Sequence, residues 1–248
     1  LARENGLGIE VMQFAMPDVL DGDWQAEVVR YRNLLRDING PISLHGPFID
    51  TASGSPDQRI NALAMDRYRH AIDIAVELDS KIIVFHANFI GSLRNNMYRS
   101  GWHRRNVDFW GEMAEYAAGR GRILTIENMW EYAPDILSDL LSEVDHPALM
   151  ACLDIGHAHL FGDDEYQVSD WVAALKPWLI HTHMNNNDGQ VDEHHGFEWP
   201  GGVLEYHGIL QQIRALDPPP NIVLEMWDVA DMRDSLPYLE ISDRTPTS

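Results

Sequence analysis

Short apolar runs rich in β-branched residues alternate with helix-length amphipathic segments along the chain. The runs occupy residues 7–13, 42–45, 81–86, 123–127, 149–154, 179–184 and 221–226. Helical periodicity is clearest in residues 57–78, 107–118, 135–141 and 204–216. Continuous apolar strands separated by helices are typical of a parallel sheet that is covered on both faces. The pattern therefore predicts an α/β fold.

Seven strands are one fewer than a closed (β/α)8 TIM barrel contains. The first residues, LARENGLGIEV, have the pattern of a helix end, a turn and a strand. We therefore expect an eight-fold barrel whose first βα unit is truncated or not part of this sequence. No linker or low-complexity tract divides the chain, and its length fits one domain of this kind. The prediction is a single TIM-barrel domain over residues 1–248.

The charge balance limits the classes of partner. Lys and Arg number 18 against 39 Asp and Glu, which gives a formal net charge of −21. A surface of this sign repels polyanions at long range, so duplex DNA is not an expected partner. The chain has no apolar run long enough to span a membrane. Its one cysteine, Cys152, excludes an intrachain disulfide and is typical of a reducing cytoplasm, which is the predicted location.

A metal-capable side chain stands at or next to the end of six consecutive apolar runs. These side chains are His45, His86, Glu127, Asp154, His183 and Glu225. The C-terminal ends of barrel strands lie on one face, and that face carries the active site. One such residue alone has ordinary explanations, such as a helix cap, but six in register indicate a shared pocket. Carboxylates buried there would need compensation, which divalent cations can supply. The sequence thus predicts a metal centre.

The loops after these strands carry further candidate ligands. His157 follows Asp154 by three residues, where the chain turns from strand toward helix. In the loop after His183, Asp192 and His194 are two residues apart, so in extended backbone their side chains point the same way. His181 shares a strand face with His183 and is a candidate for substrate contact. Trp130 and Trp199 could wall the pocket or serve plain packing.

Several of these motifs resemble one known superfamily. They are IEN at 126–128, LDIGH at 153–157, the HTH strand at 181–183 and LE at 224–225. Over nearly its whole length the chain resembles the xylose-isomerase-like TIM barrels, which include sugar isomerases, epimerases and endonuclease IV (AP endonuclease family 2). The segment VDEHH at 191–195 is similar to the endonuclease IV branch, a group of three-zinc phosphodiesterases.

The resemblance implies up to three bound ions, most simply zinc. The implied ligand sets are His45, His86 and Glu127 for the first, Glu127, Asp154, His183 and Glu225 for the second, and His157, Asp192 and His194 for the third. Phe48 occupies the stretch where such nucleases contact substrate and is a candidate for substrate binding. The chain departs from this branch in its acidity and in lacking an evident basic groove, which argues against a DNA substrate.

Two reactions remain open. In the first, clustered ions activate a water for hydrolysis of a small phosphoester, with Glu127 bridging two ions and His157 holding the leaving-group ion. In the second, one manganese or magnesium ion polarises a sugar or sugar-phosphate carbonyl, Glu127 or Glu225 moves the α proton, and His157 contacts substrate. The complete ligand set favours the hydrolase, whereas the acidic surface fits the isomerase or epimerase better. A binding module without activity is disfavoured because all candidate ligands are retained.

Overall fold

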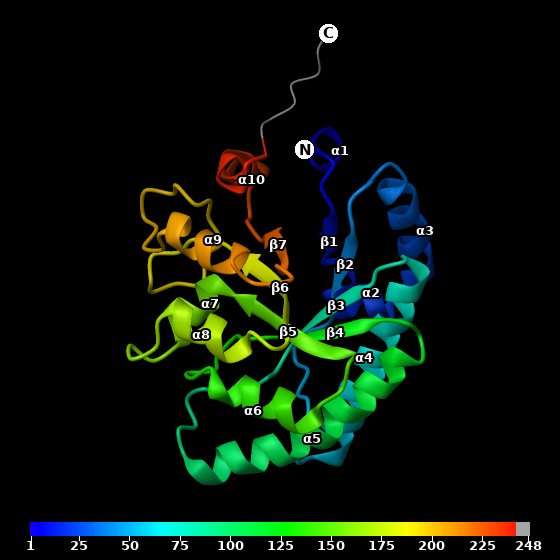
Figure 1. The fold of residues 1–248 in the computed structure, drawn as a ribbon. Coiled ribbons are helices and arrows are strands. Elements are labelled where there is room, and N and C mark those ends of the chain that lie inside the picture. The colour runs from blue at the N-terminus through cyan, green and yellow to red at the C-terminus, as the bar shows by residue number, and fades with distance from the viewer. Residues whose placement is uncertain (242–248) are drawn as a thin grey trace.

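The computed structural model describes residues 1–241, and seven parallel strands form its centre (Figure 1). The strands are β1 (Ile9–Val11), β2 (Ile42–His45), β3 (Ile82–His86), β4 (Ile123–Glu127), β5 (Leu149–Asp154), β6 (Leu179–Met184) and β7 (Asn221–Leu224). Each strand pairs with the next along the chain, from β1 to β7. The sheet curls into a nearly closed barrel with helices around it, so the predicted TIM-barrel fold is confirmed.

The helices follow the strands in alternation. The longer ones are α3 (Trp24–Leu35), α4 (Gln58–Glu77), α5 (Asn96–Ala118), α6 (Asp135–Val144), α8 (Val168–Leu175) and α9 (Tyr206–Arg214). Shorter ones are α1 (Ala2–Asn5), α2 (Pro17–Asp21), α7 (Ile155–Phe161) and α10 (Val229–Ser235), with 3-10 turns η1 (Gln13–Ala15) and η2 (Leu236–Leu239). None of the helices in residues 1–241 has the length and hydropathy needed to cross a bilayer.

Helix α5 begins earlier than the periodicity of residues 107–118 predicts. It starts at Asn96 because the Asn95 side chain accepts a hydrogen bond from the backbone N–H of Tyr98, which caps the helix. Arginines in this first half obscure the apolar period in the sequence. The other three predicted helices are confirmed within a few residues of their ends.

Large aromatic side chains fill the layer between β3 and the helices α4 and α5. The Tyr68 ring stacks on Phe85 with 4.3 Å between centroids and lies 5.6 Å from Trp110. All three rings are fully buried. Aromatic burial of this kind is among the largest apolar contributions to stability, so this layer anchors the outer helices on the barrel.

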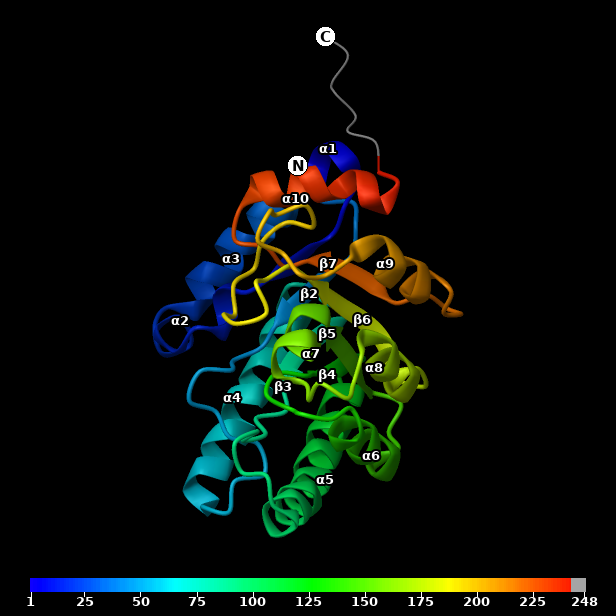
Figure 2. The same ribbon diagram turned by 90° about the vertical axis from the view of Figure 1, so that its left-hand side faces the viewer.

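The strand register brings the C-terminal strand ends together. His86 lies opposite Glu127 in the β3–β4 ladder, and Asp154 lies opposite His183 in the β5–β6 ladder. Figure 2 looks onto this side of the barrel, with α7 and the loop between β6 and α9 in front of the sheet. The candidate ligands therefore share one face.

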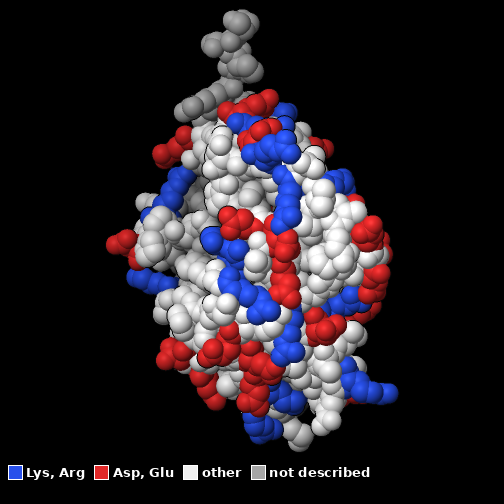
Figure 3. All heavy atoms as spheres, turned by 90° about the vertical axis from the view of Figure 1, so that its right-hand side faces the viewer, with Lys and Arg blue, Asp and Glu red and all other residues white. Residues whose placement is uncertain are grey.

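Charges on the outer helices are interleaved rather than segregated. Figure 3 shows basic and acidic residues side by side on the face that carries α3 and α4. Pairs that bridge neighbouring helices there include Arg32 with Glu77 and Arg69 with Glu112. Exposed pairs of this kind contribute little stability each.

Candidate metal centre

Four side chains from four consecutive strands converge at the centre of the barrel mouth. Glu127 ends β4, Asp154 ends β5, His183 lies in β6, and Glu225 follows β7. One ligand atom from each lies within 4.8 Å of those of the others. His183 Nδ1 is 3.2 Å from Glu127 Oε1 and 3.1 Å from Glu225 Oε2. We name these residues the four-ligand group.

Two histidines share the other oxygen of Glu127. Nε2 of His45 and Nε2 of His86 each lie 3.3 Å from Glu127 Oε2. The Phe48 ring packs against both imidazoles, with centroid separations of 5.2 Å to His45 and 5.0 Å to His86. Glu127 thus stands between two groups of candidate ligands, and Phe48 forms a wall beside one of them.

A third group lies nearer to solvent. Nε2 of His157 and Nε2 of His194 each lie 3.3 Å from Asp192 Oδ1, and the Asp192 side chain is 33% exposed. The loop that carries Asp192 and His194 is held by paired backbone hydrogen bonds between Asn186 and His195. Asn186 also anchors the loop through side-chain bonds to the backbone of Phe197 and Leu204.

Backbone carbonyls orient three of the candidate histidines. Nδ1 of His45 donates to Gly46 O at 2.9 Å, Nδ1 of His157 to Asn128 O at 3.0 Å, and Nδ1 of His194 to Glu225 O at 2.9 Å. This leaves Nε2 of each ring facing a carboxylate of the groups above. Metal-binding histidines characteristically have the other ring nitrogen held in this way.

Helix α7 places His157 through the same strand end that supplies Asp154. The Asp154 carboxylate caps α7 by accepting from His157 N at 2.6 Å. Its second oxygen accepts from Asn185 Nδ2 at 3.0 Å. Both contacts fix the orientation of the carboxylate, which a ligand of a metal ion requires.

The carboxylates of the four-ligand group are too close together to be ionised without compensation. Burial raises the pKa of Asp154 to about 6, and nearby Glu225 and Glu127 act in the same direction. Burial would also raise the pKa of Glu127, but the imidazoles of His183 and His86 hold it well below its usual value. Burial opposes charge on His157 and His183 in turn, but their acidic neighbours raise the pKa of both well above 6.5.

The residues fit divalent cations. Glu225 Oε2 and His157 Nε2 are buried without an aligned hydrogen-bond partner, although each has candidate ligand atoms within 3.3 Å. Ligand atoms gathered around one ion have such spacings without being bonded to each other. The four-ligand group is rich in oxygen donors, which suit manganese or magnesium, whereas the two histidine-rich groups suit zinc.

The predicted substrate residues fall in different places. Trp130 is 47% exposed and lines a cavity of about 540 Å³ together with Ile90, Gly91, Ser92, Arg94, Leu160 and Phe161. The Phe161 ring lies 5.8 Å from that of His157, so this cavity adjoins the ligand groups. Trp199 stacks on His195 at 3.9 Å in the loop after β6. His181 is buried one layer deeper in the barrel, with Nε2 2.9 Å from Glu10 Oε2.

Two buried glutamates near the candidate ligands, Glu10 and Glu131, were not predicted from the sequence. Glu10 interrupts the apolar strand β1 and contacts His181 and His183. A charged residue inside so short an apolar run is the sequence feature that could have marked Glu10 as part of the site. Glu131 lies in the loop after β4 and is 1% exposed. No periodic pattern marks a loop residue of this kind, so its burial could not be read from the sequence.

Comparison with known proteins places this architecture in a family. A family model described as a xylose isomerase-like TIM barrel matches residues 1–241. The chain is 29% identical over 227 residues to the uncharacterised protein MJ1311 of Methanocaldococcus jannaschii, covering 86% of this chain and 75% of that protein.

Solved structures agree with this placement. A D-tagatose 3-epimerase-like protein is 25% identical with a TM-score of 0.79, over 94% of this chain and 88% of its own. The TTHB071 protein from Thermus thermophilus, soaked with ZnCl2, is 28% identical with a TM-score of 0.79, over 95% and 88%. The chain belongs to the xylose isomerase-like TIM barrel family.

Proposed function

We propose that this protein is a divalent-metal sugar isomerase or epimerase, with one essential ion in the four-ligand group. The observation that carries the proposal is the placement of two carboxylates, Glu127 and Glu225, on either side of His183 Nδ1, at 3.2 and 3.1 Å. Burial acts to raise the pKa of both carboxyl groups, but the neighbouring histidines, His183 foremost, together keep it below the usual value. Both are therefore available as proton acceptors at neutral pH.

The reaction needs only a proton to be moved. An ion held by the four-ligand group would polarise a substrate carbonyl and the hydroxyl next to it. One of Glu127 and Glu225 would accept the proton from the carbon α to that carbonyl. If the other carboxyl first took up a proton from solvent and delivered it to the opposite face, the configuration would invert with no oxidant or reductant, and the first carboxyl would release its proton to solvent. Return of the proton to the neighbouring carbon, with the hydroxyl proton passing to the former carbonyl oxygen, would give the isomerised sugar instead.

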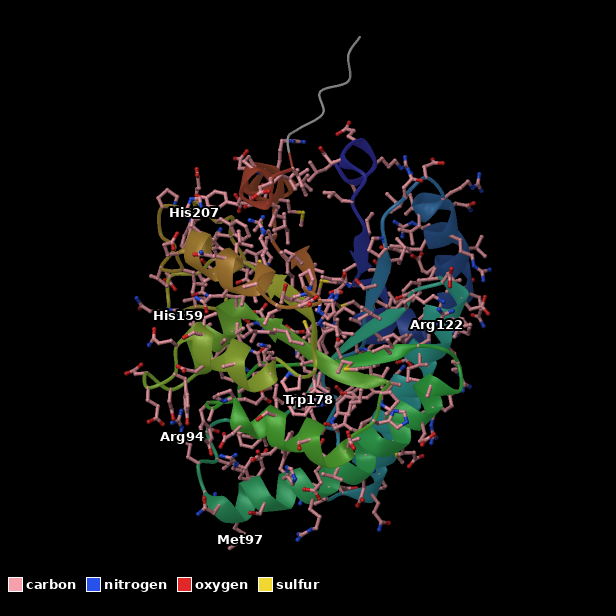
Figure 4. The ribbon with its side chains drawn as sticks, in the orientation of Figure 1. Arg94, Met97, Arg122, His159, Trp178 and His207 are labelled. Atoms are coloured by element: carbon pink, nitrogen blue, oxygen red, sulfur yellow. The ribbon has the colours of Figure 1, made fainter. Side chains whose placement is uncertain are left out.

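The charges around the site favour an uncharged substrate. In the described part of the chain, the one Lys or Arg among the buried residues is Arg122. It pairs with Asp79 before β4, and Figure 4 shows it on the opposite side of the molecule from Arg94 and His159. Arg94 itself is engaged by Asp163 at 2.5 Å. A phosphate dianion would therefore find little cationic compensation from the protein itself.

The adjoining cavity and the structural similarity support the same reaction. At about 540 Å³, the cavity beside Trp130 falls within the range of small-molecule sites. Aromatic walls such as Trp130 and Phe161 can pack on the apolar face of a sugar ring. The similarity to a D-tagatose 3-epimerase-like protein, at 25% identity, is in line with a monosaccharide substrate.

A second candidate is hydrolysis of a small phosphoester, and a specific observation favours it. The groups around His45 with His86, and around Asp192, hold histidine nitrogens at 3.3 Å from carboxylate oxygens. A single-ion isomerase does not need either group as ligands. Three zinc ions would account for all nine candidate ligands, and would activate a water while neutralising phosphoryl charge.

Proton exchange with solvent separates the two reactions. We would incubate the manganese-, cobalt- or zinc-loaded protein with ketohexoses and ketopentoses in D2O and follow the α carbon by NMR. The proposal expects deuterium incorporation and a new epimer or aldose, with both lost in Glu127→Gln. The matched control is Glu143→Gln, which removes an exposed carboxylate paired with His103 on the outer helices. Phosphoester turnover without any deuterium incorporation would contradict the proposal and support the hydrolase.

A further inference from the structure

His183 is oriented differently from the other candidate histidine ligands. His45, His157 and His194 each direct Nδ1 to a backbone carbonyl and Nε2 to a carboxylate of the metal centre. In His183 the order is reversed, because Nδ1 forms a hydrogen bond of 3.2 Å with Glu127 Oε1 and lies 3.1 Å from Glu225 Oε2. Its Nε2 points down into the barrel, where Glu10 Oε1 lies 2.8 Å away. A side chain thus stands where these three rings have a backbone carbonyl.

Glu10 is placed to accept from several donors at once. It lies in the middle of β1 with its side chain 5% exposed. Its Oε2 accepts from Ser43 Oγ at 2.7 Å and lies 2.9 Å from His181 Nε2. Glu10 Oε1 and His183 Nε2 are close, but they are not aligned for a hydrogen bond, and neither atom has another hydrogen-bond partner. An ionised carboxylate has acceptor sites for all three neighbours, whereas a glutamine has only one acceptor oxygen.

The tautomer of His183 decides whether it can bind a cation. With the proton on Nδ1, the ring donates to Glu127 Oε1 in the hydrogen bond that the structure shows, and has no lone pair for an ion in the four-ligand group. With the proton on Nε2, Nδ1 is free to coordinate, and the buried proton needs an acceptor. Glu10 Oε1 is the carboxylate oxygen beside that nitrogen, 2.8 Å away.

We propose that Glu10 is a positioning residue for the metal centre: it holds His183 with its proton on Nε2 and leaves Nδ1 free for a divalent cation. His181, which sequence analysis predicted as a substrate contact, serves in this arrangement to fix Glu10 from below. The inference rests on the proposed metal site, but it does not depend on the substrate being a sugar.

Metal affinity of a Glu10→Gln variant tests the proposal. We would measure Zn²⁺ and Mn²⁺ dissociation constants by competition with a chromophoric chelator for the wild type, Glu10→Gln, Glu10→Asp and Glu143→Gln. Loss of an outer partner of a metal-binding histidine typically weakens affinity about 10- to 100-fold, and we expect this for Glu10→Gln. Glu143→Gln, which removes an exposed carboxylate paired with the half-buried His103, should bind like the wild type. A folded Glu10→Gln with wild-type affinity would overturn the proposal.

An NMR measurement on the wild-type protein tests the same proposal without requiring that the Glu10→Gln variant folds. The ¹⁵N shifts of zinc-loaded wild type report which nitrogen of each imidazole carries the proton. The His183 signal is assigned as the one that is lost in His183→Asn. We expect a protonated Nε2 and a metal-bound Nδ1. Coordination through Nε2, or an ion held between Glu10 and the two histidines of β6, would overturn the proposal.

The results distinguish a failure of the role of Glu10 from a failure of the proposed isomerase function. Weakened zinc binding in Glu10→Gln, in a protein that converts no sugar, would leave this inference standing and refute the isomerase. Sugar turnover together with wild-type metal affinity in Glu10→Gln would refute only the role of Glu10.

Discussion

Replacement of Glu131 by Gln should stabilise the protein at alkaline pH and have little effect at acidic pH. Glu131 is 1% exposed in the loop after β4. Its Oε2 accepts from Met129 N at 2.6 Å, and its Oε1 has no hydrogen-bond partner. Burial raises the pKa of this carboxyl from 4.5 to about 7. The folded protein therefore keeps a proton on Glu131 at pH values where the unfolded chain has lost it.

The sign and the size of the effect follow from linkage. Because the folded pKa is the higher one, stability is lost as pH rises from 4.5 to about 7, and stays lost above that. Each pKa unit corresponds to about 1.4 kcal/mol, so the whole window corresponds to about 3 kcal/mol. The side-chain amide of the Glu131→Gln variant is neutral at every pH, so the variant escapes this loss.

Urea unfolding of the chelator-treated protein between pH 5 and pH 8 measures the effect. The free-energy difference between Glu131→Gln and wild type should grow by about 2.5 kcal/mol in favour of the variant across this range, because a small part of the loss already precedes pH 5. Glu143→Gln is the matched control, since the Glu143 side chain is 61% exposed and its replacement should not produce this slope. A difference that does not change with pH would refute the reasoning.

Three further predictions concern the metal centre and the barrel wall. Manganese or zinc at about 100 times its dissociation constant should stabilise the protein by about 2.7 kcal/mol, seen as a chelator-reversible rise in Tm, and an unchanged Tm would count against a site. Burial opposes charge on His157 and His183, but their acidic neighbours raise the pKa of both well above 6.5. A cation must displace these protons, so cation affinity measured by competition should keep rising above pH 6.5. An affinity independent of pH would contradict this prediction. Gly46→Ala should destabilise by about 1–3 kcal/mol in urea unfolding, because its Cβ would lie 2.1 Å from the Phe85 ring, while Gly111→Ala, which meets open space, should not.

The sequence predicts the barrel and the strand-end ligands for one physical reason. Strands buried on both faces must be apolar, so a polar residue such as Asp154 at the end of a run is conspicuous. The parallel register then brings such residues to one face, and the structure places all nine candidate ligands in three adjoining groups. Their role as metal ligands stays a prediction.

Other features depend on contacts that one-dimensional patterns do not record. Glu10 and His181 meet only because β1 and β6 curl toward each other across the barrel, 171 residues apart in sequence. The start of α5 depends on the side chain of Asn95 acting as a cap, and Asn also favours turns, so the residue type alone does not mark a helix start. The buried state of Glu131 depends on how the loop after β4 packs, which no periodicity reports.

The metal content of the wild type and of two ligand variants tests the central claim most directly. Protein loaded with manganese or zinc and then desalted would be analysed by elemental mass spectrometry, beside Asp154→Asn and His45→Asn. The account predicts about one or more tightly held ions per chain in the wild type. The ion of the four-ligand group should be lost in Asp154→Asn and retained in His45→Asn. A count near three that falls in both variants would favour the trinuclear hydrolase. A wild type that retains no ion, or an Asp154→Asn that keeps its full content, would contradict the four-ligand site.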